Sequence, residues 1–259
     1  MSALQDALVI LGPAMIAGLL VVVSHVPLGL QVLSRGIVFI DLAVAQVAGL
    51  GVIVARTLGL AGEGWGTQAA AVLAALLGSL LLTWTERRRP DVQEARIGVR
   101  FVLASTAQIL LLANDPHGGE DLKELLAGQI LWVGAPQLLR AAALTALFVL
   151  VWWRWRERIG RAGFYVLFAL VVTVSVQLVG VYLVFSSLIV PALAVYRHAA
   201  RWRLWLGLAM GVVSYAAGLL CSALFDLPAS PMIVWAMALV GIVVHRSGRA
   251  AAEAQDRRA

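Results

Sequence analysis

Nine apolar runs dominate this chain of 259 residues. A helix needs about 20 apolar residues to cross the hydrocarbon core of a bilayer, and fewer where it is packed inside protein. The runs that meet this requirement lie at residues 8–28, 38–58, 67–84, 97–113, 135–153, 163–179, 181–197, 204–224 and 230–246. We therefore predict an all-α integral membrane protein with about nine transmembrane helices.

The composition supports this class and excludes others. Hydrophobic residues make up 61% of the chain, whereas soluble domains are about 45–50% apolar. The net charge of +6 comes from basic residues in short loops between the apolar runs. That placement is typical of topology signals, so nucleic acid is not expected as a partner. Cys221 is the single cysteine, which excludes an internal disulfide.

The basic loops also predict the orientation in the membrane. They lie at Arg35, 86–96, 154–161, 197–203 and after residue 246. With Arg100, which follows the loop 86–96, counted on the same side, only Arg56, Lys123 and Arg140 remain for the other side, which also holds the acidic loop 115–124. Basic loops face the cytoplasm, so we expect the N-terminus outside and the C-terminus inside. This requires an odd number of spans.

The segment 163–197 has no polar break, and two interpretations of it are open. It is either two short spans with a tight turn near Gln177–Gly180, or one span followed by a re-entrant segment. The odd number of spans favours the first. We expect a single transmembrane domain over residues 1–246 and a short charged cytoplasmic tail over 247–259.

Two polar residues mark the second apolar run. Asp41 stands at its edge. An ionised group near the hydrocarbon costs roughly several kcal/mol unless it is paired or faces a water-filled cavity. Gln46 follows five residues later, and its amide also needs a partner. Both could line a cation path through the bundle. Alternatively, Asp41 caps a helix or pairs with Arg35.

The outer loop offers a second candidate site. His117 and Glu120 are spaced so that both would lie on one face of a helix and could bind a divalent metal loosely. Asp115 and Asp121 are equally consistent with plain solvated charge. The segment 120–126 is predicted to form a short amphipathic helix on the membrane surface.

The chain lacks the motifs of an enzyme. Lys123 is its sole lysine and lies in the outer loop, so no P-loop can hold ATP. The sequence contains no H-E-x-x-H or G-x-S-x-G motif. We expect a non-enzymatic membrane subunit, with any ATP hydrolysis on a separate chain.

The segment from Gly180 to Arg203 suggests contact with a cytoplasmic partner. It is apolar up to Val190 and then becomes basic. We predict that Pro191 starts a short helix there, because proline is favoured in the first turn of a helix. The residues expected to meet the partner are Pro191, Tyr196, Arg197, His198, Arg201 and Arg203.

Five stretches resemble a known family. They are VLSRGIVFIDLAVAQVAGLGV, QEARIGVRF, LLAGQILWV, VGVYLVFSSLIVPALAVYRHAARW and GLLCSALFDLPASPMIVWAMALVG. In this order they are similar to the transmembrane permease subunits of metal-ion ABC importers of the zinc, manganese and iron class. The last stretch includes an Asp-Leu-Pro turn at Asp226–Pro228 and a final helix entered at Pro231.

The resemblance implies an ABC importer permease-like bundle in the bacterial inner membrane, acting as a homodimer. A cytoplasmic ATPase would dock on a coupling helix near 191–203. An extracytoplasmic metal-binding protein would dock near the loops 60–66 and 114–134. The chain itself would bind no cofactor, and its substrate would be a divalent metal.

One departure from the family concerns the ion path. Family members carry an aspartate and a histidine four residues apart on the second span. Here the histidine position is Gln46, and Asp41 is one residue out of register. Glutamine is a weaker ligand than imidazole for zinc. Zinc is the first expectation, with manganese and then iron as the other candidates.

Two other classes of function compete with this interpretation. A secondary carrier driven by an ion gradient would need no ATPase, but it predicts more ionisable residues within the spans than Asp41 alone. A membrane scaffold without transport activity would use the basic loops only to recruit a partner. A neighbouring gene for an ATP-binding cassette protein would favour the importer over both.

Overall fold

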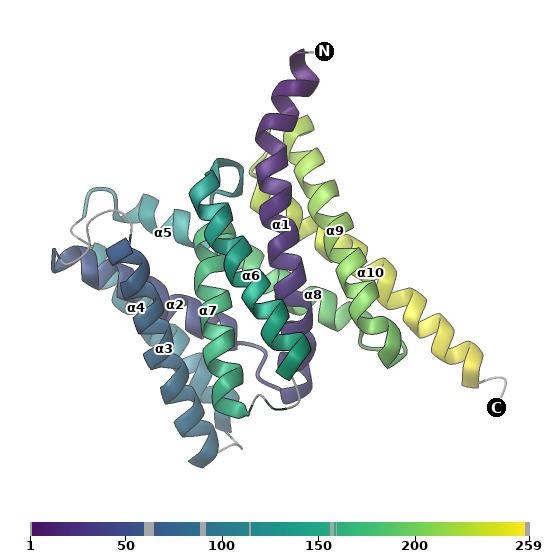
Figure 1. The fold of residues 1–259 in the computed structure, drawn as a ribbon, viewed down its shortest axis with the longest axis horizontal. Coiled ribbons are helices and arrows are strands. Elements are labelled where there is room, and N and C mark those ends of the chain that lie inside the picture. The colour runs from purple at the N-terminus through teal and green to yellow at the C-terminus, as the bar shows by residue number, and fades with distance from the viewer. Residues whose placement is uncertain are drawn as a thin grey trace. The chain divides into compact units, whose positions relative to one another are not determined.

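The computed structural model describes residues 2–59, 65–88, 92–113, 115–155, 158 and 160–256, and every regular element among them is a helix (Figure 1). The α-helices are α1 (Ser2–Arg35), α2 (Ile40–Thr57), α3 (Trp65–Arg88), α4 (Gln93–Leu112), α5 (Gly118–Ala127), α6 (Ala135–Trp155), α7 (Arg161–Val179), α8 (Val181–Val195), α9 (Ala200–Phe225) and α10 (Ala229–Asp256). A 3-10 turn, η2 (Ile130–Trp132), follows α5. The predicted all-α fold is confirmed.

Eight of these helices are long and apolar enough to cross a membrane, judged by length and composition among the described residues. The exception among the predicted runs is α8. Its 15 residues give a length of about 22 Å at 1.5 Å per residue, short of a hydrocarbon core of about 30 Å. The break before α8 is confirmed at Gly180, whose φ is 80°. The nine-span topology and the orientation stay predictions.

The chain forms two compact units, which we describe separately. Unit 1 comprises residues 1–35, 127–145 and 178–259, and unit 2 comprises residues 36–126 and 146–177. The single domain expected for 1–246 stays a prediction. The expected tail is helical up to Asp256, as a continuation of α10, and residues 257–259 lie outside the described part.

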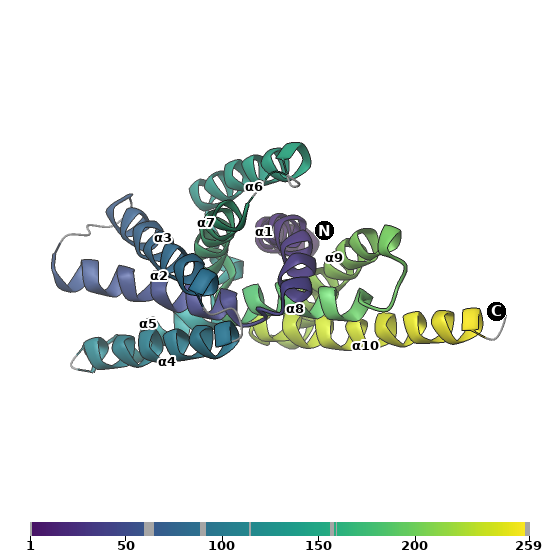
Figure 2. The ribbon, with the colours of Figure 1, turned by 90° about the horizontal axis from the view of Figure 1, so that it is seen from below.

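Unit 1 is built around α8, which packs against α1, α9 and α10 (Figure 2). Of its 15 residues, 11 are buried. Small residues let the helix backbones approach closely: Gly29 of α1 lies against the carbonyl group of Leu188, and Gly211 of α9 faces Val22 of α1. Glycine and other small residues are the usual means of close helix packing in membranes.

Two left-handed glycines meet at one place in unit 1. Gly128, after α5, has a φ of 69°, and Gly180, before α8, has a φ of 80°. A Cβ on either glycine would overlap the backbone of the other segment. Only glycine adopts this conformation without steric cost and leaves room for so close an approach.

Unit 2 is built around α2, which packs against α3 and α4. The outward faces of α3 and α4 carry exposed large apolar side chains, among them Leu73, Leu77, Leu80, Val99, Leu103 and Leu110. Apolar side chains exposed along membrane-length helices suit contact with lipid rather than with water.

Candidate ion path and partner contact sites

Asp41 lies inside unit 2, in the first turn of α2, with only 1% of its surface exposed. Neither of its carboxylate oxygens accepts a hydrogen bond of ordinary geometry from a described residue. The groups that act on it are the backbone N–H groups of Asp41 and Leu42 and the charge of Glu94. The positive N-terminus of α2 compensates its charge in part. Both a capping role and a place in an ion path fit this position.

Glu94 brings a second carboxylate to the same end of unit 2. It is in the first turn of α4, and its Oε1 accepts a hydrogen bond from the backbone N–H of Phe39 at 3.2 Å. Its Oε2 is buried and has no hydrogen-bond partner among the described residues. Glu94 thereby holds the turn that leads into α2. Sequence reasoning missed it, although it is the one acidic residue directly before the fourth apolar run.

Gln46 is tied to α4 by a buried amide pair. Gln108 Nε2 donates to the backbone oxygen of Gln46 at 2.7 Å and to its Oε1 at 2.9 Å. The two residues are 1% and 0% exposed. The expectation that Gln46 needs a partner is confirmed. Sequence reasoning missed Gln108, for which the signal was a lone amide within an apolar run.

A polar network joins the end of α3 to the start of α4. Arg100 Nη2 donates to Thr85 Oγ1 at 3.1 Å, and Arg96 Nη1 donates to the backbone oxygen of Thr85 at 3.3 Å. Gln93 Nε2 donates to the backbone oxygen of Leu82 at 3.2 Å. These bonds fix the two helices beside α2. No local pattern in the sequence pairs these residues.

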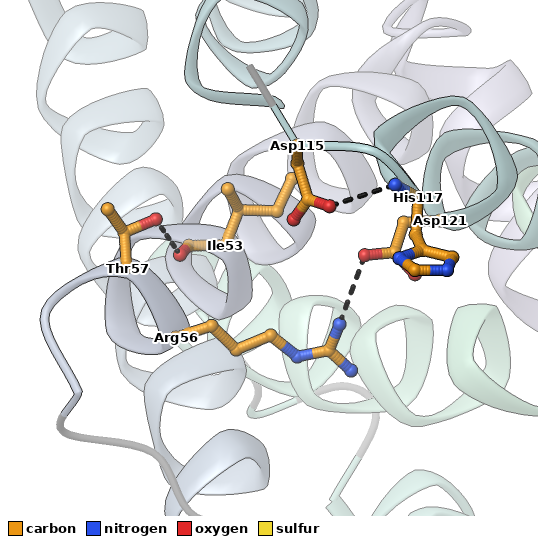
Figure 3. A network of polar contacts seen from close by, with 6 residues as sticks. All are labelled: Ile53, Arg56, Thr57, Asp115, His117 and Asp121. Atoms are coloured by element: carbon orange, nitrogen blue, oxygen red, sulfur yellow. Dashed lines mark hydrogen bonds and ion pairs between the residues drawn. The ribbon is translucent and has the colours of Figure 1, made fainter. Parts of the chain in front are cut away.

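The outer loop is organised mainly by its backbone (Figure 3). The N–H of His117 donates to Asp115 Oδ1 at 2.9 Å, and its carbonyl accepts from the amides of Glu120 and Asp121. Arg56 Nη1 lies 3.4 Å from Asp121 Oδ2 in an exposed ion pair. His117 therefore precedes α5 rather than lying on its face.

A metal site in this loop stays a prediction. The described residues contain no group of three or more His, Cys, Asp or Glu side chains placed to hold a metal ion. The pair of His117 and Glu120 alone would bind a metal weakly, because two ligands leave most of the coordination sphere to water. The predicted helix over 120–126 is confirmed as part of α5.

The prediction that Pro191 starts a short helix is wrong. Pro191 lies inside α8 and is buried. Proline removes one backbone hydrogen bond from a helix interior, and the burial of α8 against three neighbouring helices outweighs that loss. The chain turns at 196–199 and then enters α9 at Ala200. The segment 191–203 is thus the end of one helix, a turn and the start of another.

The turn at 196–199, with the first residues of α9, is held by specific contacts. Arg203 Nε donates to the backbone oxygen of His198 at 2.9 Å, and its guanidinium lies 5.4 Å from the centre of the Tyr196 ring. Arg197 and Arg201 are exposed. The structure therefore brings Tyr196, His198 and Arg203 together and leaves two arginines available to a partner.

Eight membrane-length helices among the described residues, with carboxyl and amide groups buried between them, are those of a polytopic membrane protein. The chain belongs to the ABC 3 transport family, whose model matches residues 7–160 and 157–246. Members of this family are permease subunits of ABC transporters, which do not themselves hydrolyse ATP. The chain is accordingly a multi-pass protein of the bacterial inner membrane.

Individual relatives agree with this family. The chain is 24% identical over 242 residues to the "Manganese transport system membrane protein MntC" of Halalkalibacterium halodurans, covering 85% of this chain and 81% of that protein. Its fold is similar to a chain of PsaBC from Streptococcus pneumoniae in complex with Fab, with a TM-score of 0.77, 22% identity and 94% and 95% of the two chains covered.

A second solved structure has the same fold. It is described as "An inward-facing conformation of a putative metal-chelate type ABC transporter" and matches with a TM-score of 0.67 and 17% identity. The match covers 94% of this chain and 89% of that chain.

Proposed function

We propose that this chain is the permease subunit of an ABC importer that moves a divalent transition metal ion into the cytoplasm. A separate ATPase would drive it, and an extracytoplasmic binding protein would deliver the ion. Membership of the ABC 3 transport family supports the importer. The printed name of the relative from Halalkalibacterium halodurans, a manganese transport protein, supports a metal as the substrate.

The observation that carries the proposal is the buried carboxylate of Asp41. A buried carboxyl group without a hydrogen-bond partner is costly in the membrane interior, and coordination of a passing cation would compensate that cost. Both Asp41 oxygens are buried, and neither accepts a hydrogen bond of ordinary geometry from the described residues. On this proposal Asp41 contacts the ion in transit, with Glu94 close enough for its charge to contribute.

The donors on α2 and α4 favour manganese. Within the described part of the chain, the buried acceptors without a hydrogen bond on these two helices are both carboxylate oxygens of Asp41, Oε2 of Glu94 and Oε1 of Gln108. Carboxylate and carbonyl oxygens suit Mn²⁺, whereas Zn²⁺ is better served by imidazole and thiolate. These oxygen donors shift our preference from zinc to manganese. Gln46 supports the path indirectly, because its amide is already bonded to Gln108.

Metal uptake into vesicles that contain the chain and its ATPase tests the proposal, with Mn²⁺, Zn²⁺ and Fe²⁺ supplied in turn. We expect ATP-dependent uptake, fastest for Mn²⁺. Replacing a metal-contacting carboxylate should lower uptake at limiting metal by about tenfold or more. Asp41→Asn should show this loss with an unchanged amount of folded protein.

Asp226→Asn is the matched control, because Asp226 is exposed and left-handed, with a φ of 52°, a conformation that Asn also tolerates. It should transport normally. Equal losses of folded protein and of uptake in Asp41→Asn would assign Asp41 to helix capping. Uptake driven by an ion gradient without ATP would identify a secondary carrier instead.

A further inference from the structure

The C-terminal part of α10 contacts the turn at 196–199. His198 Nε2 lies 3.4 Å from Ser247 Oγ, and Gly248 is buried beneath the His198 ring. A Cβ at Gly248 would lie 2.5 Å from Cε1 and 2.6 Å from Nδ1 of His198. Nonbonded carbon atoms need about 3.5–4.0 Å. The imidazole can therefore sit against α10 only because residue 248 is glycine.

The same turn is held from α9. Arg203 bonds the backbone oxygen of His198 and covers the ring of Tyr196. The turn is thus fixed from two helices, with His198 in both sets of contacts. Such fixation orders the surface before a partner arrives, which lowers the entropy lost on binding.

Exposed arginines flank this contact. Arg197 directly precedes His198, and Arg246 directly precedes Ser247. The side chains of Arg197, Arg201 and Arg246 are all exposed. Asp226 is the only acidic residue between positions 181 and 248 of the sequence. It caps the opposite end of α9, a helix of 26 residues and hence about 39 Å long. The next acidic residue after Asp226 is Glu253, seven positions beyond Arg246.

We propose that the C-terminal end of α10 belongs to the docking surface for the ATPase subunit, with Arg246 as a contact beside Arg197 and Arg201, and with His198 on Gly248 as the contact that positions them. The choice of the ATPase as the occupant rests on the proposed function. The complementary surface is a groove lined with carboxylates, which arginine binds in a directed, bidentate manner.

A protein groove fits this surface better than lipid headgroups. Attraction to an anionic membrane depends on the number of nearby charges and requires no fixed spacing between them. On this surface the turn that carries Arg197 is held in place relative to α10 by the steric contact of His198 with Gly248. The hydrogen bond from Arg203 to His198 holds it relative to α9. Acidic groups on a folded partner have a fixed spacing that can match it.

The first test is the affinity of the ATPase subunit for the purified permease in lipid nanodiscs. Arg246→Glu should weaken binding by about tenfold, because a reversed charge at an interface repels the partner. Arg158→Glu reverses an exposed arginine in another loop and should bind as the wild type does. Nanodiscs of phosphatidylcholine alone, or with added phosphatidylglycerol, separate protein contact from lipid contact.

The second test is a rescue. Gly248→Ala should weaken ATPase binding, because the new methyl group displaces the His198 ring. In the double variant Gly248→Ala/His198→Ala the ring is absent, so α10 meets no obstruction, and binding should recover above that of Gly248→Ala. Alanine also favours the helix, so loss of α10 itself is not expected.

Three outcomes would overturn the inference. They are unchanged ATPase affinity in Arg246→Glu, an effect of Arg246→Glu that appears only with phosphatidylglycerol, and no effect of Gly248→Ala. Recovery in the double variant supports it. ATPase binding is measured without metal. Failure of metal uptake would therefore refute the proposed substrate without deciding whether the ATPase docks on this surface.

Discussion

The two units of the chain hold their apolar helices together by different combinations of close glycine contacts and side-chain hydrogen bonds. In unit 1, Gly29 of α1 lies against the backbone carbonyl of Leu188, and a buried hydrogen bond of 2.9 Å joins the hydroxyls of Ser187 and Tyr215. In unit 2, Gly51 of α2 lies close to the backbone oxygen of Ala70 in α3, and a buried amide pair joins Gln46 to Gln108. Lipid is as apolar as the helices, so burial of apolar surface alone does not drive helix association in a membrane. Close contact and hydrogen bonding are the two available substitutes.

The contrast extends to charge. Unit 2 places the carboxylates of Asp41 and Glu94 at neighbouring helix starts. The interior of unit 1 has neutral polar groups, such as the hydroxyls of Ser24 and Ser214, which donate to carbonyls of their own helices. The carboxyl groups suit unit 2 to an ion path, and the backbone contacts suit unit 1 to rigid support of the turn at 196–199.

The largest expected effect is at Gly29. A methyl group there would overlap the carbonyl of Leu188, and overpacking of this kind costs about 3 kcal/mol. Gly29→Ala should therefore lower the unfolding midpoint of the purified protein strongly. Gly12→Ala, in the same helix, meets nothing within 4 Å and should be neutral or stabilising by up to about 1 kcal/mol. Equal behaviour of the two variants would remove the basis for describing unit 1 as held by backbone contact.

An intermediate effect is expected at Gln108. Gln108→Leu removes the donor from two oxygens of Gln46 and should destabilise the protein by about 1–3 kcal/mol, since an acceptor is left buried and unsatisfied. The double variant Gln46→Leu/Gln108→Leu removes the stranded side-chain oxygen as well, and it should be more stable than Gln108→Leu. Chemical denaturation of all three proteins measures this. A double variant less stable than Gln108→Leu would show that the amide pair does not bind the two helices.

The smallest effect is expected in the outer loop. His117 acts there through its N–H and carbonyl groups, which alanine retains, so His117→Ala should stay within about 0.5 kcal/mol of the wild type. Asp115→Ala removes the acceptor of that N–H and should cost about 1 kcal/mol. Thermal unfolding and metal uptake measure both variants. Complete loss of uptake in His117→Ala would establish a metal role for its ring.

The sequence predicted the helices well because their signal is local. Apolar runs, the break at Gly180 and the short helix after His117 follow from residues that are close in the chain. It also predicted that Gln46 needs a partner, since an amide in an apolar span is costly alone. The identity of that partner was beyond local reasoning, because Gln108 is 62 residues away.

Pro191 shows a second limit of reasoning from local sequence, in which a local signal is overridden by packing. A proline before a small-residue turn locally favours a helix start, yet the burial of α8 continues the helix through it. The contact of His198 with Gly248 was equally hidden, because it depends on the course of α10 past the turn. In each case the deciding energy comes from tertiary packing between elements far apart in sequence.

The meeting of Gly128 with Gly180 has a consequence for biosynthesis. The contact joins residues that are about 50 positions apart, with α6 and α7 between them. A chain is synthesised at about 5–20 residues per second. The segment after α5 therefore waits for several seconds, until both intervening helices have been synthesised, before it can settle. During that interval the segment around Gly128 lacks the backbone surface of Gly180 against which it packs in the finished protein.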